Sequence, residues 1–128
     1  MLIVLDTNII VSALMTPDGK AFALLEQVLQ GKYIICLSPE IFAEYQDVLH
    51  REKLHLNRYF VDYLLSVFYI QGIWIEPLPS NPHRIFMRDE SDRKFFDVAK
   101  CLHAKLVTGN FKHYPVDELI TSLDELIS

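Results

Sequence analysis

Apolar runs and amphipathic segments alternate along the chain. Residues 2–5, 33–37 and 73–75 are continuously apolar, and two further short, mostly apolar runs lie at 105–108 and 119–121. Continuous apolar runs of this length predict strands that are buried on both faces. Because helical segments separate them, we expect an α/β fold in which helices cover both faces of a parallel sheet.

The helical segments are identified by apolar residues that recur every three or four positions. We expect helices from about Asn8, from Lys20 to Leu29, from Pro39, from Asn57 to Ile70, from Ser91 to Ala104, and in a short C-terminal segment. Ser38 before Pro39 is a typical helix start, because the serine caps the helix and proline fits its first position. The proline-rich segment 76–84 is predicted to be a connection within one domain.

Length and charge add limits to this prediction. With 128 residues, the chain is expected to form one domain over residues 1–128. Its net charge of −5 gives no overall argument for a nucleic-acid partner, so such a contact requires local basic patches. The longest apolar stretch, residues 59–70, is interrupted by Asp62 and is too short to span a membrane. We therefore expect a cytoplasmic protein that makes no membrane contact.

The two cysteines do not suggest a disulfide or a zinc site. Cys36 lies in a predicted strand and Cys101 in a predicted helix, without CxxC spacing or further cysteines. Both are expected to be buried, reduced thiols.

Asp6 directly follows the first apolar run. In an open parallel sheet, binding sites form outside the carboxyl ends of the strands, and Asp6 is expected at that edge. The same residue could simply cap the helix that begins near Asn8. Its position alone leaves both interpretations open.

Two further acids lie on apolar helix faces. Glu44 falls within the apolar stripe of the helix that starts at Pro39, where an unpaired acid is costly. Asp92 lies three residues before Phe95, on the apolar face of its helix. Glu44 could instead be half exposed or bridge to an arginine, and Asp92 could stabilise the helix N-terminus. Asp97, about 140° around the helix from Asp92, is a weaker candidate.

Thr108 and Asn110 follow the predicted strand near residue 106, so they emerge at the same sheet edge as Asp6 unless they form a simple turn. Three carboxylates close together repel one another unless a cation lies among them. Oxygen ligands without His or Cys favour Mg²⁺ or Mn²⁺, which suits phosphodiester hydrolysis. The sequence contains no Walker loop, GxGxxG or Ser-His-Asp pattern that would support nucleotide-cofactor or acyl-transfer chemistry.

Four segments, taken in order, resemble the successive motifs of PIN domains. They are LDTNIIVSAL at 5–14, SPEIFAEYQDVL at 38–49, RDESDRKFFDVA at 88–99 and LVTGNFKHYP at 106–115. They are most similar to the VapC-like branch of toxin-antitoxin toxins, and the resemblance covers nearly the whole chain. It implies a three-layer, Rossmann-like PIN domain with about five parallel strands, and a metal-dependent endoribonuclease that hydrolyses single-stranded or structured RNA.

The resemblance also implies the site. The family's metal-binding acids, which hold Mg²⁺ or Mn²⁺, fall on Asp6, Glu44 and Asp92, and the remaining catalytic positions, which position water, fall on Asn8, Thr108 and Asn110. Family members usually carry Asp where this chain has Asn110, and an amide brings no charge to a second metal. Asp97 often has a Glu counterpart in this branch. Many PIN toxins form homodimers and are inhibited by a small antitoxin protein. For this chain, we expect hydrolysis to leave a 5′-phosphate and a 3′-hydroxyl.

Basic residues near the motifs are candidates for RNA contacts. They are Arg51, Lys53 and Arg58 in one segment, and Arg88, Arg93, Lys94, Lys112 and His113 beside the third and fourth motifs. Such side chains bind phosphates, although charged residues near helix ends are commonly only solvated.

Two other functions stay open at this point. Because Asn110 brings no charge, the domain could bind RNA or protein without cleaving it. A phosphoacceptor domain, as in receiver domains, also has an acid at a strand end. That function needs an acidic pair near the start and an Asp after a later strand, and residues 33–37 are not followed by one.

Overall fold

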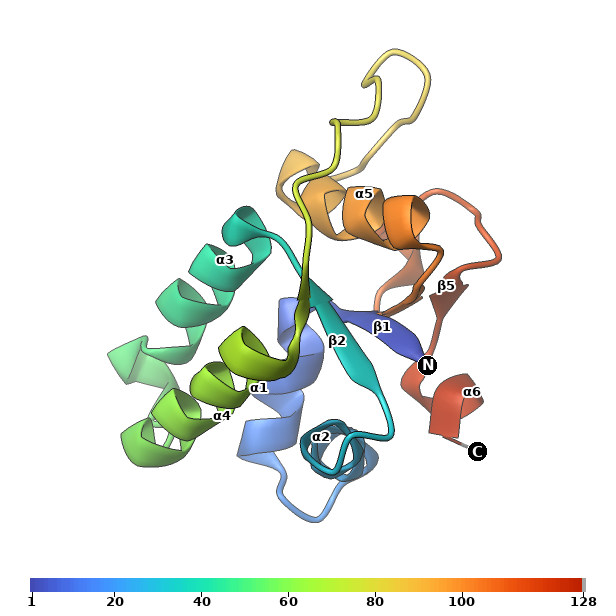
Figure 1. The fold of residues 1–128 in the computed structure, drawn as a ribbon. Coiled ribbons are helices and arrows are strands. Elements are labelled where there is room, and N and C mark those ends of the chain that lie inside the picture. The colour runs from blue at the N-terminus through green and yellow to red at the C-terminus, as the bar shows by residue number, and fades with distance from the viewer. Residues whose placement is uncertain (128) are drawn as a thin grey trace.

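The computed structural model describes residues 1–127, in which strands and helices alternate (Figure 1). The strands are β1 (Leu2–Leu5), β2 (Ile34–Leu37), β3 (Ile73–Trp74), β4 (Lys105–Val107) and β5 (Ile120–Thr121). The α-helices are α1 (Thr7–Met15), α2 (Lys20–Leu29), α3 (Pro39–Leu49), α4 (Arg58–Gln71), α5 (Arg93–Leu102) and α6 (Leu123–Ile127). Short 3₁₀ turns are η1 (Glu52–Leu54), η2 (Glu90–Asp92) and η3 (Phe111–His113).

The strands form one parallel sheet in the order β3-β2-β1-β4-β5. The chain builds outward from β1 to β2 and β3, and then returns to the other side of β1 for β4 and β5. The carboxyl ends of β1 and β4 therefore flank the switch point at which open α/β sheets bind ligands. This is a Rossmann-like order, whereas receiver domains have the order 2-1-3-4-5, so the receiver alternative is wrong about the fold.

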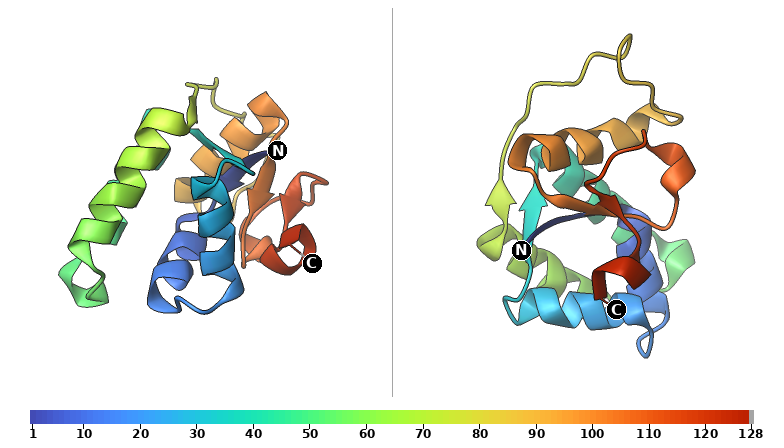
Figure 2. Two further views of the ribbon diagram at one scale, coloured as in Figure 1. Left: turned by 60° about the horizontal axis from the view of Figure 1, so that its bottom comes forward. Right: turned by 90° about the vertical axis from the view of Figure 1, so that its right-hand side faces the viewer.

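Helices cover both faces of the sheet. Figures 1 and 2 show α5 on one side of the sheet and α1, α2 and α4 on the other. The buried apolar side chains of sheet and helices form one cluster, which includes Ile3, Val4 and Leu5 of β1 without any exposed surface. The predicted α/β fold with helices on both faces of a parallel sheet of five strands is confirmed.

The helix starts follow from local capping. The Ser38 hydroxyl accepts a hydrogen bond from the Ile41 amide at 3.2 Å, and Pro39 occupies the first turn of α3. The Asn57 side chain accepts from the Phe60 amide at 3.1 Å at the start of α4. Both helices therefore begin where the sequence predicts, because the capping residue satisfies a free amide of the first turn.

Two local expectations differ from the structure. The helix expected from Ser91 begins at Arg93, because the Asp89 side chain accepts from the Ser91 amide at 2.9 Å and holds the preceding residues in η2. Cys36 is buried as expected, but Cys101 is exposed on α5, so the prediction of a buried thiol there is wrong. Among the described residues, no helix combines the length and apolar character needed to cross a membrane.

Candidate functional site

Asp6 lies at the carboxyl end of β1 and is 6% exposed. Its Oδ1 accepts from the Asn8 amide at 3.3 Å and so caps α1, as one interpretation of the sequence predicted. Its Oδ2 faces the other way and accepts from the hydroxyls of Thr108 and Tyr114, each at 3.0 Å. One carboxylate therefore both starts a helix and belongs to a polar cluster at the sheet edge.

The sheet register explains why Thr108 reaches Asp6. Leu5 of β1 pairs with Val107 of β4, so the residues that follow these two strands lie beside each other. The Asp6 amide continues the ladder by donating to the Val107 carbonyl at 3.1 Å. Thr108 has no exposed surface, and its hydroxyl also accepts a hydrogen bond from the backbone amide of Asn110 at 3.0 Å.

Two buried tyrosines border the acids. Burial, and then the nearby charges of Asp6 and Asp92, raise the pKa of Tyr114, so its hydroxyl stays protonated and donates to Asp6. Burial, and then the charges of Asp6 and Glu44, raise the pKa of Tyr45 well above its ordinary value. The Tyr45 hydroxyl donates to the Leu5 carbonyl at 2.5 Å, which fixes α3 against the end of β1.

Asp92 lies at the N-terminus of α5 but does not cap it with its side chain. Its Oδ2 lies 3.1 Å from Nδ1 of His113, and Nε2 of His113 lies 3.0 Å from the side-chain nitrogen Nδ2 of Asn110. Burial, and then the charge of Asp6, raise the pKa of Asp92 above its ordinary value. Asp6 and Asp92 therefore act on each other as two acids at one edge.

Glu44 on α3 is neutralised within the chain. Its Oε1 pairs with the Lys94 ammonium at 2.7 Å, and the Thr7 hydroxyl donates to Oε2. From the sequence, a bridge from Glu44 to an arginine was one alternative, but its basic partner is a lysine. Since Thr7 follows Asp6, Glu44 lies beside the cluster formed by Asp6 and Thr108.

The acids fit a hard cation in charge and donor type, but not as a complete cage. In residues 1–127, no three acidic, histidine or cysteine side chains are arranged to hold a metal ion. Asp6 and Asp92 offer carboxylate oxygens, and a cation between them would relieve the repulsion that raises the pKa of Asp92. Glu44 is the weaker ligand candidate, because Lys94 already balances its charge.

The basic candidates for RNA contact divide into three groups. Arg88 and Lys112 are exposed near Asp92 and Asn110, in the segments that lead into η2 and form η3. Arg51, Lys53 and Arg58 are exposed beyond the far end of α3, where Arg51 also pairs with Asp47 at 2.9 Å. Arg93, Lys94 and His113 make contacts within the chain.

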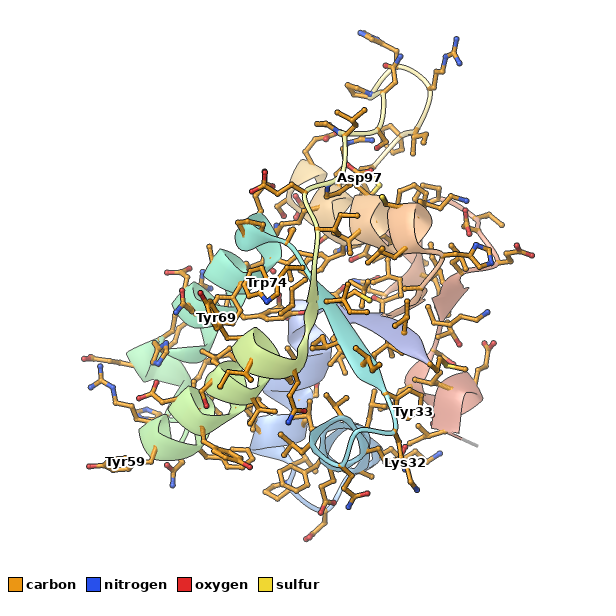
Figure 3. All side chains as sticks on the ribbon, viewed as in Figure 1. Lys32, Tyr33, Tyr59, Tyr69, Trp74 and Asp97 are labelled. Atoms are coloured by element: carbon orange, nitrogen blue, oxygen red, sulfur yellow. The ribbon has the colours of Figure 1, made fainter. Side chains whose placement is uncertain are left out.

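Arg93 and Asp97 hold the proline-rich segment against α5. The Arg93 guanidinium bonds the Ser80 hydroxyl at 2.6 Å, the Ile85 carbonyl at 2.8 Å and Glu90 at 2.7 Å. Asp97 accepts from the Ser80 amide at 3.1 Å, and Figure 3 shows it where this segment meets α5. A hollow of about 420 Å³ lies between the segment and the start of α3.

Several residues of the cluster were missed from the sequence. Tyr114 and Thr7 were not among the candidates, and His113 was considered only for RNA contact. A tyrosine followed by proline after a short loop resembles an ordinary core residue, and Thr7 resembles part of a helix start. No local signal in the sequence distinguishes them.

Comparisons with known proteins identify the family and the fold of the chain. The sequence profile of a family described as PIN domain matches residues 2–112. The chain is 31% identical over 111 residues to the uncharacterized protein MJ1680 of Methanocaldococcus jannaschii. This alignment covers 84% of this chain and 70% of that protein. Among solved structures, it resembles a chain of VapBC2 from Rickettsia felis, crystallised with a DNA fragment from the promoter. That match has a TM-score of 0.62 and 22% identity, and covers 95% of this chain and 98% of the other.

Proposed function

The chain belongs to the PIN domain family, and we propose on this basis that it is a metal-dependent endoribonuclease that hydrolyses phosphodiesters of single-stranded or structured RNA. PIN domains are typically nucleases and generally depend on a metal ion. Mg²⁺ or Mn²⁺ is the proposed cofactor, because the side chains around Asp6 offer oxygen donors.

The observation that carries this proposal is the pair formed by Asp6 and Asp92. Two acids face one sheet edge, and the donors that touch Asp6 are hydroxyls and an amide rather than basic groups. Asp6, which has no basic partner among residues 1–127, is therefore uncompensated at a ligand-binding edge, whereas Asp92 contacts His113. An acid buried for a purely structural reason would be expected to have a basic partner.

The proposed roles follow from the contacts. Asp6 and Asp92 would hold the metal ion, with Glu44 as a further acid if it leaves Lys94. A bound ion would act as a Lewis acid, which would activate water and balance charge on the phosphate. Thr108 and Tyr114 orient the Asp6 carboxylate, and the backbone amide of Asn8 donates to its other oxygen. The proposed role of Asn8, Thr108 and Asn110 in positioning water comes from the family resemblance, while the contacts of Asn110 are from its backbone amide to Thr108 and from its side-chain nitrogen to His113. The proposed products carry a 5′-phosphate and a 3′-hydroxyl.

Cleavage of end-labelled single-stranded RNA by the purified chain with Mn²⁺ tests the function. We expect the wild-type chain to cleave the RNA and EDTA to abolish this cleavage. Asp6→Asn should lower the cleavage rate by at least about 100-fold, because it removes a proposed metal ligand. Asp18→Asn is the matched control, because Asp18 is an exposed acid in the turn before α2 and should cleave like the wild type.

The outcomes separate the candidate functions. Equal cleavage by wild type and Asp6→Asn would indicate a contaminating ribonuclease and contradict the proposal. No cleavage by the wild type would favour the second candidate, a PIN-fold module that binds RNA or protein without cutting it, which the uncharged Asn110 supports.

We further propose that the chain is the toxin of a type II toxin-antitoxin pair, with a small antitoxin as partner, and that it forms a homodimer. The VapC-like motifs and the fold shared with a VapBC2 chain support this role. Expression of the wild type should arrest bacterial growth and Asp6→Asn should not, and a small protein encoded beside the gene should relieve the arrest. Normal growth under wild-type expression would contradict the toxin role. The homodimer is tested separately by sedimentation velocity, which should show a species of twice the mass of one chain.

A further inference from the structure

Three side chains form a hydrogen-bonded row from η3 to the start of α5. The Asn110 amide nitrogen lies 3.0 Å from Nε2 of His113, and Nδ1 of the same ring lies 3.1 Å from Oδ2 of Asp92. The Asn110 backbone is tied to the Thr108 hydroxyl, which also donates to Asp6. The row therefore connects the two acids through groups that carry no fixed charge.

The donors in this row determine where the proton of His113 lies. The Asn110 side chain presents its Nδ2 to the ring, and because an amide nitrogen only donates, this orientation makes Nε2 of His113 the acceptor. A neutral imidazole that accepts at Nε2 carries its proton on Nδ1. That proton points at Asp92, which accepts it.

We propose that Asn110 and His113 are positioning residues that act through Asp92. Asn110 fixes the His113 tautomer with the proton on Nδ1, and the ring orients the Asp92 carboxylate toward Asp6. An aspartate at position 110 would accept rather than donate, and would require a proton on Nε2. The ring could then donate to Asp92 only as a cation, which would oppose a metal ion at the same edge. On this proposal, Asn110 makes the His113 ring a neutral hydrogen-bond donor to Asp92. Only the metal-binding part of the inference rests on the proposed nuclease function.

Nitrogen NMR of the histidine rings tests the tautomer without any activity measurement. The chain is labelled with ring-¹⁵N histidine, and long-range ¹H–¹⁵N spectra are recorded in EDTA at mildly alkaline pH, where an ordinary imidazole is neutral. We expect His113 to show a protonated Nδ1 and an unprotonated Nε2. In Asn110→Asp this pattern should disappear, because a carboxylate beside Nε2 requires a proton there.

The assignment does not depend on one variant. The chain has five histidines, and the other four, His50, His55, His83 and His103, are exposed. Each of these four can be replaced in turn, with Asn at His55 and His103, whose positive φ angles asparagine tolerates. The signal that survives all four replacements belongs to His113, even if variants of His113 itself do not fold.

Mn²⁺ binding, followed by electron paramagnetic resonance, tests the action on Asp92. His113→Leu removes the donor and should weaken Mn²⁺ binding about 10–100-fold. His113→Asn keeps an amide donor near the place of Nδ1 and should recover most of the affinity. Equal losses in both variants would indicate a packing role and overturn the positioning role.

The outcomes distinguish this inference from the proposed function. A wild-type His113 with its proton on Nε2, or an even mixture of tautomers, would overturn the inference whether or not the chain cleaves RNA. The proposed tautomer and the Asn rescue of Mn²⁺ binding, found in a chain that cleaves no RNA, would support the inference and contradict the nuclease function.

Discussion

At the scale of single residues, Asp6 has two roles because its two oxygens have different partners. Oδ1 caps α1, while Oδ2 accepts hydrogen bonds from the hydroxyls of Thr108 and Tyr114. The capping and site interpretations of its sequence position were therefore never exclusive. Asp92 differs, since its side chain makes no cap bond and meets His113 instead.

Asp92→Asn is predicted to stabilise the chain at neutral pH in EDTA. Burial and the charge of Asp6 raise the pKa of Asp92 in the folded state above the ordinary value of 3.8. The folded state therefore binds this proton more tightly than the unfolded state, and stability is lost as pH rises from the unfolded pKa through the raised folded pKa. Replacing the acid with a neutral amide should remove that loss.

Urea unfolding at neutral pH and below pH 3.8 measures this effect. The stability gain of Asp92→Asn should be present at neutral pH and shrink in acid, where wild-type Asp92 is also neutral. Asp62→Asn is the control and should show no such gain, because Asp62 is an exposed acid on α4 whose partner is His50 at the end of α3. A wild type more stable than Asp92→Asn at neutral pH would show that the His113 contact outweighs the burial cost.

At the scale of elements, a few specific contacts hold the segments around the sheet in position. Arg93 and Asp97 bind Ser80 and so attach the segment after β3 to α5. Arg93 was expected to contact RNA, but its guanidinium is engaged with this segment. Gly72, between α4 and β3, is fixed by lack of space instead of backbone conformation, since its φ is −71°.

Gly72→Ala is predicted to destabilise the chain by about 1–3 kcal/mol. A Cβ at this position would lie 2.6 Å from the Phe68 carbonyl oxygen and 2.8 Å from Leu37 Cδ1, so α4 must move away from β2. Gly109→Ala is the matched control, because a Cβ there meets nothing within 4 Å. Urea denaturation of both variants measures the difference, and equal stability would contradict the predicted clash.

At the scale of the whole molecule, strand order determines where the site forms. Because β1 and β4 are neighbours at the switch point, residues from the start and the end of the chain meet at one edge. The net charge of −5 makes this protein repel RNA overall, so the proposed RNA binding would depend on local basic groups near that edge.

Arg88→Ala and Lys112→Ala are predicted to weaken RNA binding more than Lys53→Ala. The first two lie beside Asp92 and Asn110, whereas Lys53 lies beyond the far end of α3. Each lost phosphate contact should reduce the slope of log affinity against log salt by about 0.7 for single-stranded RNA. Fluorescence anisotropy over a salt series, in an Asp6→Asn background that prevents cleavage, measures both quantities. A larger effect of Lys53→Ala would place the RNA along the opposite end of α3.

The sequence by itself determined the element order, the parallel sheet and the position of Asp6 at its edge. Apolar periodicity and the caps at Ser38 and Asn57 are local properties, because each depends on residues within a few positions of one another. The motif resemblance added the family, and the profile match confirmed it.

Only the tertiary structure decided the partners of the acids. The contact from Tyr114 to Asp6 spans 108 positions and the contact from Thr7 to Glu44 spans 37, so no local pattern predicts them. Lys94 and His113 could each have faced solvent or RNA, and the packing of α5 and η3 directs them to Glu44 and Asp92. Side-chain pairing across a sheet edge depends on strand order and register, which become defined only when the whole core has formed.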